Sequence, residues 1–86
     1  MRLNTIEKEL KTSERWGCND QPYLEWFLGV LEPIVNKISK VDMDDATLHI
    51  TFSTVPTFEE GLKLAHGAHA DECDMISPDT LRLWWD

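Results

Sequence analysis

The clearest hydrophobic pattern in the chain runs over residues 24–38, where apolar side chains recur at intervals of three and four. This spacing places them on one face of a helix. We expect the helix to begin near Gln21, with Pro22 in its first turn, and to form the centre of the core. Pro33 cannot donate the hydrogen bond to residue 29, which predicts a kink or a short break. The apolar positions are Leu24, Phe27, Leu28, Leu31, Ile34, Val35 and Ile38.

A shorter helical pattern opens the chain. Asn4 stands three residues before Glu7, the spacing of an N-cap residue and its reciprocating acid. Glu7 and Lys11 can pair across one helical turn. We therefore expect a helix over about residues 5–14. Its apolar side is formed by Leu3, Ile6 and Leu10.

Between residues 47 and 52 the period of the pattern changes to two. Leu48, Ile50 and Phe52 alternate with polar side chains. Alternation of this kind is typical of a strand that is buried on one face only. We expect these three residues to face the core.

A third helix is predicted after Pro56. Thr57 and Glu60 have the spacing of a capping box, and Gly67 can end the helix in the left-handed conformation. We expect its inner edge to consist of Phe58, Leu62 and Ala65.

The end of the chain reads as a β-hairpin. Pro78 and Asp79 lie where a type I turn favours them, with apolar residues on both sides. In the last strand Leu81, Leu83 and Trp85 share one face, and Arg82 and Trp84 share the other. The predicted fold class is α+β, a single domain over residues 1–86 in the order α-α-β-α-β-β. A three-stranded, mostly antiparallel sheet would pack on the helices.

Composition limits the classes of protein that remain. At 86 residues and 42% hydrophobic content the chain can bury one core, and we expect most of its four Trp inside it. No apolar stretch reaches the roughly 18 residues of a membrane span, and the charged start differs from an export signal. We therefore expect a cytoplasmic protein with no membrane partner. Cys18 and Cys73 are then expected as unpaired thiols in the core.

The net charge of −8 lies entirely in the second half of the chain. After residue 40 the only Lys and Arg residues are Lys63 and Arg82. A negative field repels phosphate and anionic lipid, so direct binding of nucleic acid is disfavoured and a basic partner is attracted. The acids of this half are Asp42, Asp44, Asp45, Glu59, Glu60, Asp71, Glu72, Asp74, Asp79 and Asp86.

His66, His69 and Cys73 form the one cluster that resembles a metal site. Their spacing matches no recurrent zinc pattern, and neither CxxC nor HExxH is present. As candidate nucleophiles, Cys18 and Cys73 have no oxyanion-donor loop beside them. The absence of a P-loop and of GxGxxG removes the usual nucleotide-binding signatures. We therefore expect no enzyme and no cofactor, and keep a small zinc-binding domain as an alternative.

The main prediction is an interaction module that binds, and inhibits or modulates, a partner protein with a basic surface. Acids in a first helical turn, such as Glu59, are explained by the helix dipole, whereas the other clusters are free to form a surface. The alternative is a homo-oligomeric structural protein, such as a homodimer paired through its Trp84 face. The predicted partner-binding residues are Asp42, Asp44, Asp45, Asp71, Glu72, Asp74, Arg82 and Trp84.

Overall fold

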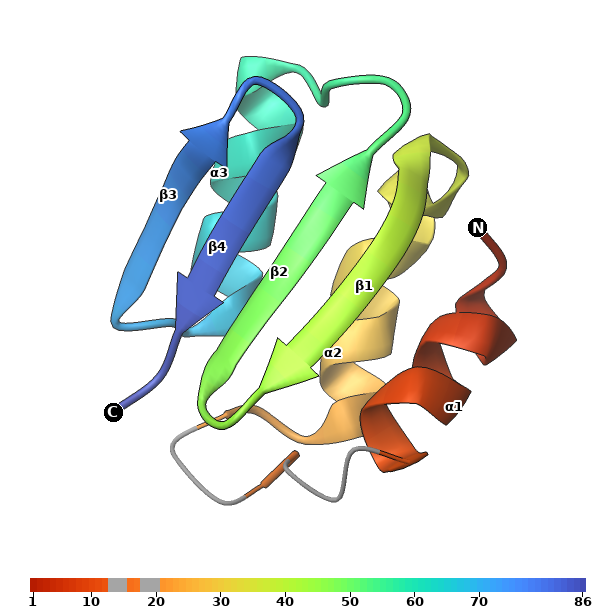
Figure 1. Ribbon diagram of the computed structural model, residues 1–86, viewed down its shortest axis with the longest axis vertical. Helices are drawn as coiled ribbons and strands as arrows, with labels where there is room; N and C mark the ends of the chain where they lie inside the picture. Colours follow the sequence, from red (N-terminus) through yellow and green to blue (C-terminus); the bar gives the residue numbers. More distant parts are fainter. Residues whose placement is uncertain (13–15, 18–20) are drawn as a thin grey trace.

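The computed structural model describes residues 1–12, 16–17 and 21–86. Over these residues helices pack on one face of an antiparallel sheet, which confirms the α+β class (Figure 1). The elements are α1 (Leu3–Thr12), α2 (Leu24–Leu31), the 3₁₀ helix η1 (Glu32–Lys37), β1 (Ile38–Asp44), β2 (Thr47–Phe52), α3 (Phe58–Ala68), β3 (Glu72–Ser77) and β4 (Thr80–Trp84).

The described sheet has four strands in the order β1-β2-β4-β3, so β1 and β3 form its two edges. The prediction of three strands in the order α-α-β-α-β-β is therefore wrong, because β1 was missed. Figure 1 shows α2 and α3 behind the sheet and α1 beside β1, so no described helix covers the front face of the sheet. No helix in the described part of the chain is long and apolar enough to cross a membrane.

A β-bulge in β1 breaks the alternation of buried and exposed residues from which a strand is predicted. The register against β2 shifts between Ile38 and Lys40, so the buried residues Ile38 and Val41 are three positions apart. This spacing is helical, and it led Ile38 to be assigned to the preceding helix.

The long helix, predicted to begin near Gln21 and to follow the apolar pattern to Ile38, is shorter than expected. It begins at Leu24 rather than near Gln21, so Pro22 precedes it. The α-helix ends at Leu31, and Pro33 lies in the first turn of η1. The break at Pro33 is thus confirmed, but the chain becomes extended at Ile38 instead of resuming the α-helix.

The first helix begins at Leu3, two residues before its predicted start, and its predicted end at residue 14 lies outside the described residues. Asn4 lies inside α1 and is not its N-cap; the carbonyl of Arg2 accepts from the amides of Thr5 and Ile6. The ion pair between Glu7 and Lys11 is present, at 3.8 Å.

The capping box that opens α3 is confirmed: Thr57 Oγ1 accepts from the Glu60 amide, and Glu60 Oε1 accepts from the Thr57 amide. The predicted C-terminus is wrong, because Gly67 is helical and His69 takes the left-handed conformation, at φ 52°. Gly67 has a packing role. A Cβ atom placed there would lie 2.6 Å from Val30 Cγ2, so the glycine lets α3 approach α2 closely.

The face that α3 turns to the core was predicted incorrectly. Leu64 and Ala68 are its buried residues, whereas 84% of Phe58 and 45% of Leu62 remain exposed. The predicted inner edge therefore points to the side of the molecule.

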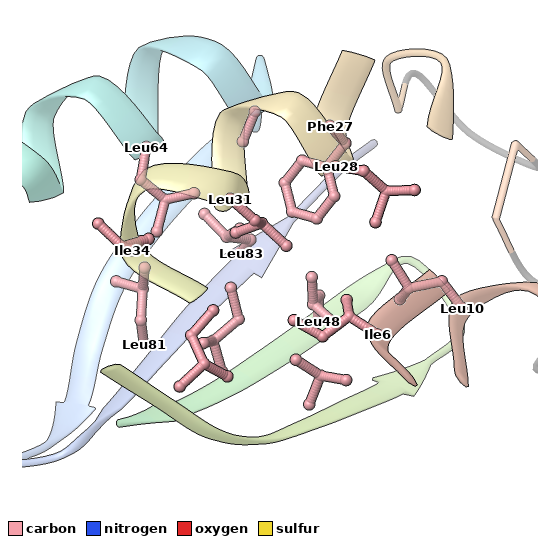
Figure 2. Packing of buried hydrophobic residues seen from close by; sticks show 14 of the residues in the cluster. Ile6, Leu10, Phe27, Leu28, Leu31, Ile34, Leu48, Leu64, Leu81 and Leu83 are labelled. Carbon is pink, nitrogen blue, oxygen red and sulfur yellow. The ribbon is translucent and has the colours of Figure 1, made fainter. Parts of the chain in front are cut away.

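The core lies between the sheet and the helices (Figure 2). Trp85 is fully buried, and its Nε1 donates to the carbonyl of Ala68 at 2.9 Å. Trp16 packs against Trp85 at a ring separation of 5.4 Å. The other Trp residues are only partly buried, and Trp26 is 57% exposed, so the expectation of mostly buried Trp is wrong. Trp26 instead ties α2 to α3 through a bond from Nε1 to the Gly67 carbonyl.

Candidate functional site

The front face of the sheet carries most of the predicted partner-binding residues. Alternation along each strand sends Leu48, Leu83 and similar residues to the core and polar side chains to the opposite face. Because α2 and α3 lie on the core side, no described helix covers these polar side chains (Figure 1). We call this surface the open face. It includes Lys40, Asp42, Asp44, Thr47, His49, Glu72, Asp74, Arg82 and Trp84.

One row of the open face crosses all four strands. Asp42 of β1 stands opposite His49 of β2, His49 opposite Arg82 of β4, and Arg82 opposite Asp74 of β3. The row therefore has a carboxylate at each margin and nitrogen-bearing side chains in its middle.

Arg82 links the centre of the open face to one margin. Its Nη1 donates to Glu72 Oε1 at 2.9 Å and to Asp74 Oδ1 at 3.2 Å. The hydrogen bond to Glu72, together with that to Asp74, raises the pKa of the guanidinium. More than half of each carboxyl side chain remains exposed, so both acids can still accept from a second cation.

A second row passes through Trp84. Asp44 stands opposite Thr47, Thr47 opposite Trp84, and Trp84 opposite Glu72. The indole of Trp84 is half-buried among small and polar neighbours. It thus offers apolar area between acidic margins, as predicted from the alternation of the last strand.

Asp45 and Asp71 lie at one end of the sheet instead of on its face. Asp45 occupies the turn between β1 and β2, at φ 53°. Asp71 directly precedes β3, and its Oδ2 accepts from the Asp86 amide at 2.7 Å. Both turns lie at the lower end of the sheet in Figure 1, so these acids extend the negative surface beyond the strands.

Two other acids of the second half, Glu60 and Asp79, serve local structure. Glu60 Oε1 accepts from Lys37 Nζ at 2.6 Å. This hydrogen bond, and secondly the one from the Thr57 amide, lower the pKa of Glu60. The hydroxyls of Ser77 and Thr80 donate to Asp79 in the hairpin turn and lower its pKa. These acids are therefore not part of the candidate site.

The possible zinc ligands are not brought together. His66 lies in the last turn of α3, His69 caps that helix, and Cys73 lies on β3. Among the described residues no three His, Cys, Asp or Glu side chains are placed to hold a metal ion. Cys73 is an exposed free thiol and not a core residue. Partial desolvation of the thiol, and secondly the negative charge of Asp74, raise the pKa of Cys73, which weakens it as a nucleophile. Cys18 lies outside the described residues.

The structure also contains an apolar groove that the sequence reasoning missed. It lies between α3 and the inner side of β3, with a volume of about 360 Å³. One wall carries Phe58, Leu62 and Ala65, and the floor carries Met75 and Leu81. The signal was present in the sequence, because Phe58, Leu62 and Ala65 form a helical stripe separate from Leu64 and Ala68. That stripe was assigned to the core.

Neither a family model, nor a curated protein, nor a solved structure matches the chain.

Proposed function

We propose that the protein is an acidic interaction module that binds a basic surface of a partner protein through its open face, and inhibits or modulates that partner. The observation that carries the proposal is the gathering of six of the eight predicted partner-binding residues on one uncovered face. These residues are Asp42, Asp44, Glu72, Asp74, Arg82 and Trp84.

The charge of the open face supports a cationic partner. Four carboxylates stand at its two margins, and its cations are Lys40 and Arg82. The margins are separated by three strand spacings, or about 14 Å. This separation is comparable to a Debye length of about 10 Å at 0.1 M salt, so a cation above the centre is attracted by both margins. Phosphate backbones and anionic lipid are repelled by the same field.

The middle of the face supplies the groups that commonly anchor an interface. Trp84 and Arg82 lie side by side between the acidic margins. Trp and Arg are enriched among residues that contribute strongly to protein–protein binding, where surrounding polar groups exclude water. We therefore propose that the four carboxylates of the open face select a basic partner and that Trp84 supplies apolar contact area.

The experiment is affinity capture from the native cell with two variants of equal net charge. The first neutralises the open face: Asp42→Asn, Asp44→Asn, Glu72→Gln and Asp74→Asn. The second neutralises exposed acids elsewhere: Glu9→Gln, Glu25→Gln, Glu32→Gln and Glu59→Gln. The wild type and the second variant should capture the same protein, and the first should capture at least about tenfold less.

The salt dependence gives a second measure. The captured partner should elute between about 50 and 500 mM salt, because exposed charges are screened in that range. Equal capture by both variants, or a complex that is insensitive to salt, would contradict the proposal. Trp84→Ala should also weaken capture while the salt dependence of the remaining complex is kept.

A further inference from the structure

Exposed apolar side chains are concentrated beside β3. Among the described residues seven large hydrophobic side chains are exposed, and four of them line the groove between α3 and β3. They are Val55, Phe58, Leu62 and Met75. Isolated exposed hydrophobics are ordinary, whereas a contiguous group beside a hollow is typical of an interaction surface.

The backbone next to this groove is an unpaired strand edge. β3 pairs with β4 on one side, and no described element lies beyond its other side (Figure 1). An unpaired edge offers alternate amides and carbonyls to another extended chain. Side chains of an added strand would lie about 5 Å from their neighbours on β3. Those on the inner side would therefore enter the groove beside Met75, and those on the outer side would meet Glu72 and Asp74.

The charges on β3 identify which strand fits there. Glu72 and Asp74 lie on the outer side of β3, and Asp71 precedes them. Arg82 contacts two of these three carboxylates and neutralises them only in part. Opposite charges on facing strands stabilise the pair, so an added strand should carry Lys or Arg on its outer side. The groove requires apolar side chains on its inner side.

A second copy of this chain fits the edge poorly. If two β3 strands pair in antiparallel fashion around Cys73 or Asp74, an acid of one copy faces an acid of the other. Pairing around Met75 would include the irregularity between Met75 and Ser77. Two molecules of net charge −8 also repel each other.

We infer that the groove and the free edge of β3 bind an extended segment of the partner by strand addition, with apolar and basic side chains alternating along that segment. The inference rests on the proposed function and assigns the partner a specific recognition element. Met75 and Phe58 contact the apolar side of the segment, and Glu72 and Asp74 contact its basic side. The backbone of β3 supplies the pairing bonds.

The probe is a synthetic peptide of the length of β3 in which lysine alternates with valine or leucine. Binding is followed by amide shifts and hydrogen exchange of the isotope-labelled full chain. The largest changes should fall on β3 and on the N-terminal half of α3. Two further peptides carry N-methyl groups on one or the other alternate set of amides. N-methylation of the amides that pair with β3 removes hydrogen-bond donors and should lower the affinity of the peptide about tenfold or more. N-methylation of the other amides should change the affinity by less than about twofold.

Matched variants test the side-chain contacts. Phe58→Ala should weaken peptide binding about tenfold, whereas Tyr23→Ala, which removes another exposed aromatic ring away from the groove, should leave it unchanged. Replacing lysine by glutamate in the peptide should abolish binding. Three outcomes would each overturn the inference. The two N-methyl sets could lower affinity equally, or the peptide could shift only the amides of His49 and Trp84. The wild type could also self-associate through a contact that Phe58→Ala removes.

The two proposals can fail separately. If the captured partner depends on the open-face acids but not on Phe58, strand addition is wrong and the proposed function stands. If the peptide pairs with β3 but the open-face variant captures the same proteins as the wild type, the proposed function is wrong.

Discussion

The two edges of the sheet are built in opposite ways. At the β1 edge α1 packs against the strand, and the amino group of Met1 donates to the carbonyls of Val35 and Ile38 at 3.2 and 2.8 Å. Ile38 and Val41 are buried there. At the β3 edge no described element covers the strand, and none of its residues is buried.

The helices behind the two edges differ in the same sense. Ile6 and Leu10 of α1 are almost fully buried, as are Phe27 and Leu31 of α2. In α3 the apolar stripe that includes Phe58 is directed to the groove instead. Apolar area near β1 therefore stabilises the fold, whereas much of the apolar area near β3 remains in water.

This difference shows which apolar residues are available for binding. An apolar residue that folding has already removed from water gains little from a partner, whereas one that stays exposed gains roughly 25 cal/mol per Å² when a partner covers it. We therefore assign stability to the β1 edge and propose recognition for the β3 edge.

The largest expected effect separates the two edges directly. Ile6→Ala removes a fully buried side chain and should lower the free energy of unfolding by about 2–5 kcal/mol. Phe58→Ala removes an exposed ring and should change it by less than about 0.5 kcal/mol. Urea unfolding of both variants measures the difference. If Phe58→Ala costs as much as Ile6→Ala, the groove is part of the core and the comparison is wrong.

A smaller effect concerns the contact that fixes α3 beside α2. Gly67→Ala would place Cβ at 2.6 Å from Val30 Cγ2, so the helices must separate, at a cost of about 1–3 kcal/mol. Gly29→Ala, in α2, meets no atom within 4 Å and should instead stabilise the protein by about 0.5–1 kcal/mol.

The double variant Val30→Ala/Gly67→Ala identifies the cause. It removes both γ-methyl groups from the contact and should be less destabilised than the sum of the two single variants. Additive losses in thermal unfolding would show that crowding against Val30 is not the reason for the glycine.

The sequence predicted elements well where one pattern acted alone. The alternation of Leu48, Ile50 and Phe52 and the capping box of Thr57 and Glu60 each follow from neighbours a few residues away, and both are confirmed. The hairpin turn at Pro78 and Asp79 is also present. Local chemistry is sufficient for the capping box and the hairpin turn because their hydrogen bonds join residues close in sequence. The strand was found from its period of two, although its hydrogen bonds run to β1 and β4.

The failures occurred where distant contacts decide. The bulge in β1 gives Ile38 and Val41 a helical spacing, and only pairing with β2 shows that they belong to a strand. Gly67 resembles a helix end until Val30 is known to lie against it. Phe58 was placed inside because an apolar residue is usually buried.

The candidate site shows the same division. Alternation predicted that Arg82 and Trp84 share a face, and the pairing of β2 with β4 places His49 beside them. The order β1-β2-β4-β3 could not be predicted, yet it is what puts Asp42 and Asp74 at opposite margins of one face. Asp45 and Asp71 lie at the end of the sheet because their local turns, and not the strand period, set their positions.

The smallest expected effect concerns the ion pair between Lys37 and Glu60, which joins η1, next to β1, to α3, next to β3. Since this contact lowers the pKa of Glu60 below its ordinary value of 4.5, its stabilisation is fully present above that value and is lost as the pH falls through the lowered pKa. Glu60→Gln should therefore be less stable than the wild type at neutral pH, and the difference should shrink below pH 4.5. Glu59→Gln, beside it and more exposed, should follow the wild type throughout. A difference for Glu60→Gln that stays constant with pH in urea unfolding would show that the carboxylate charge is not its cause, and η1 and α3 would then be joined by packing and not by charge.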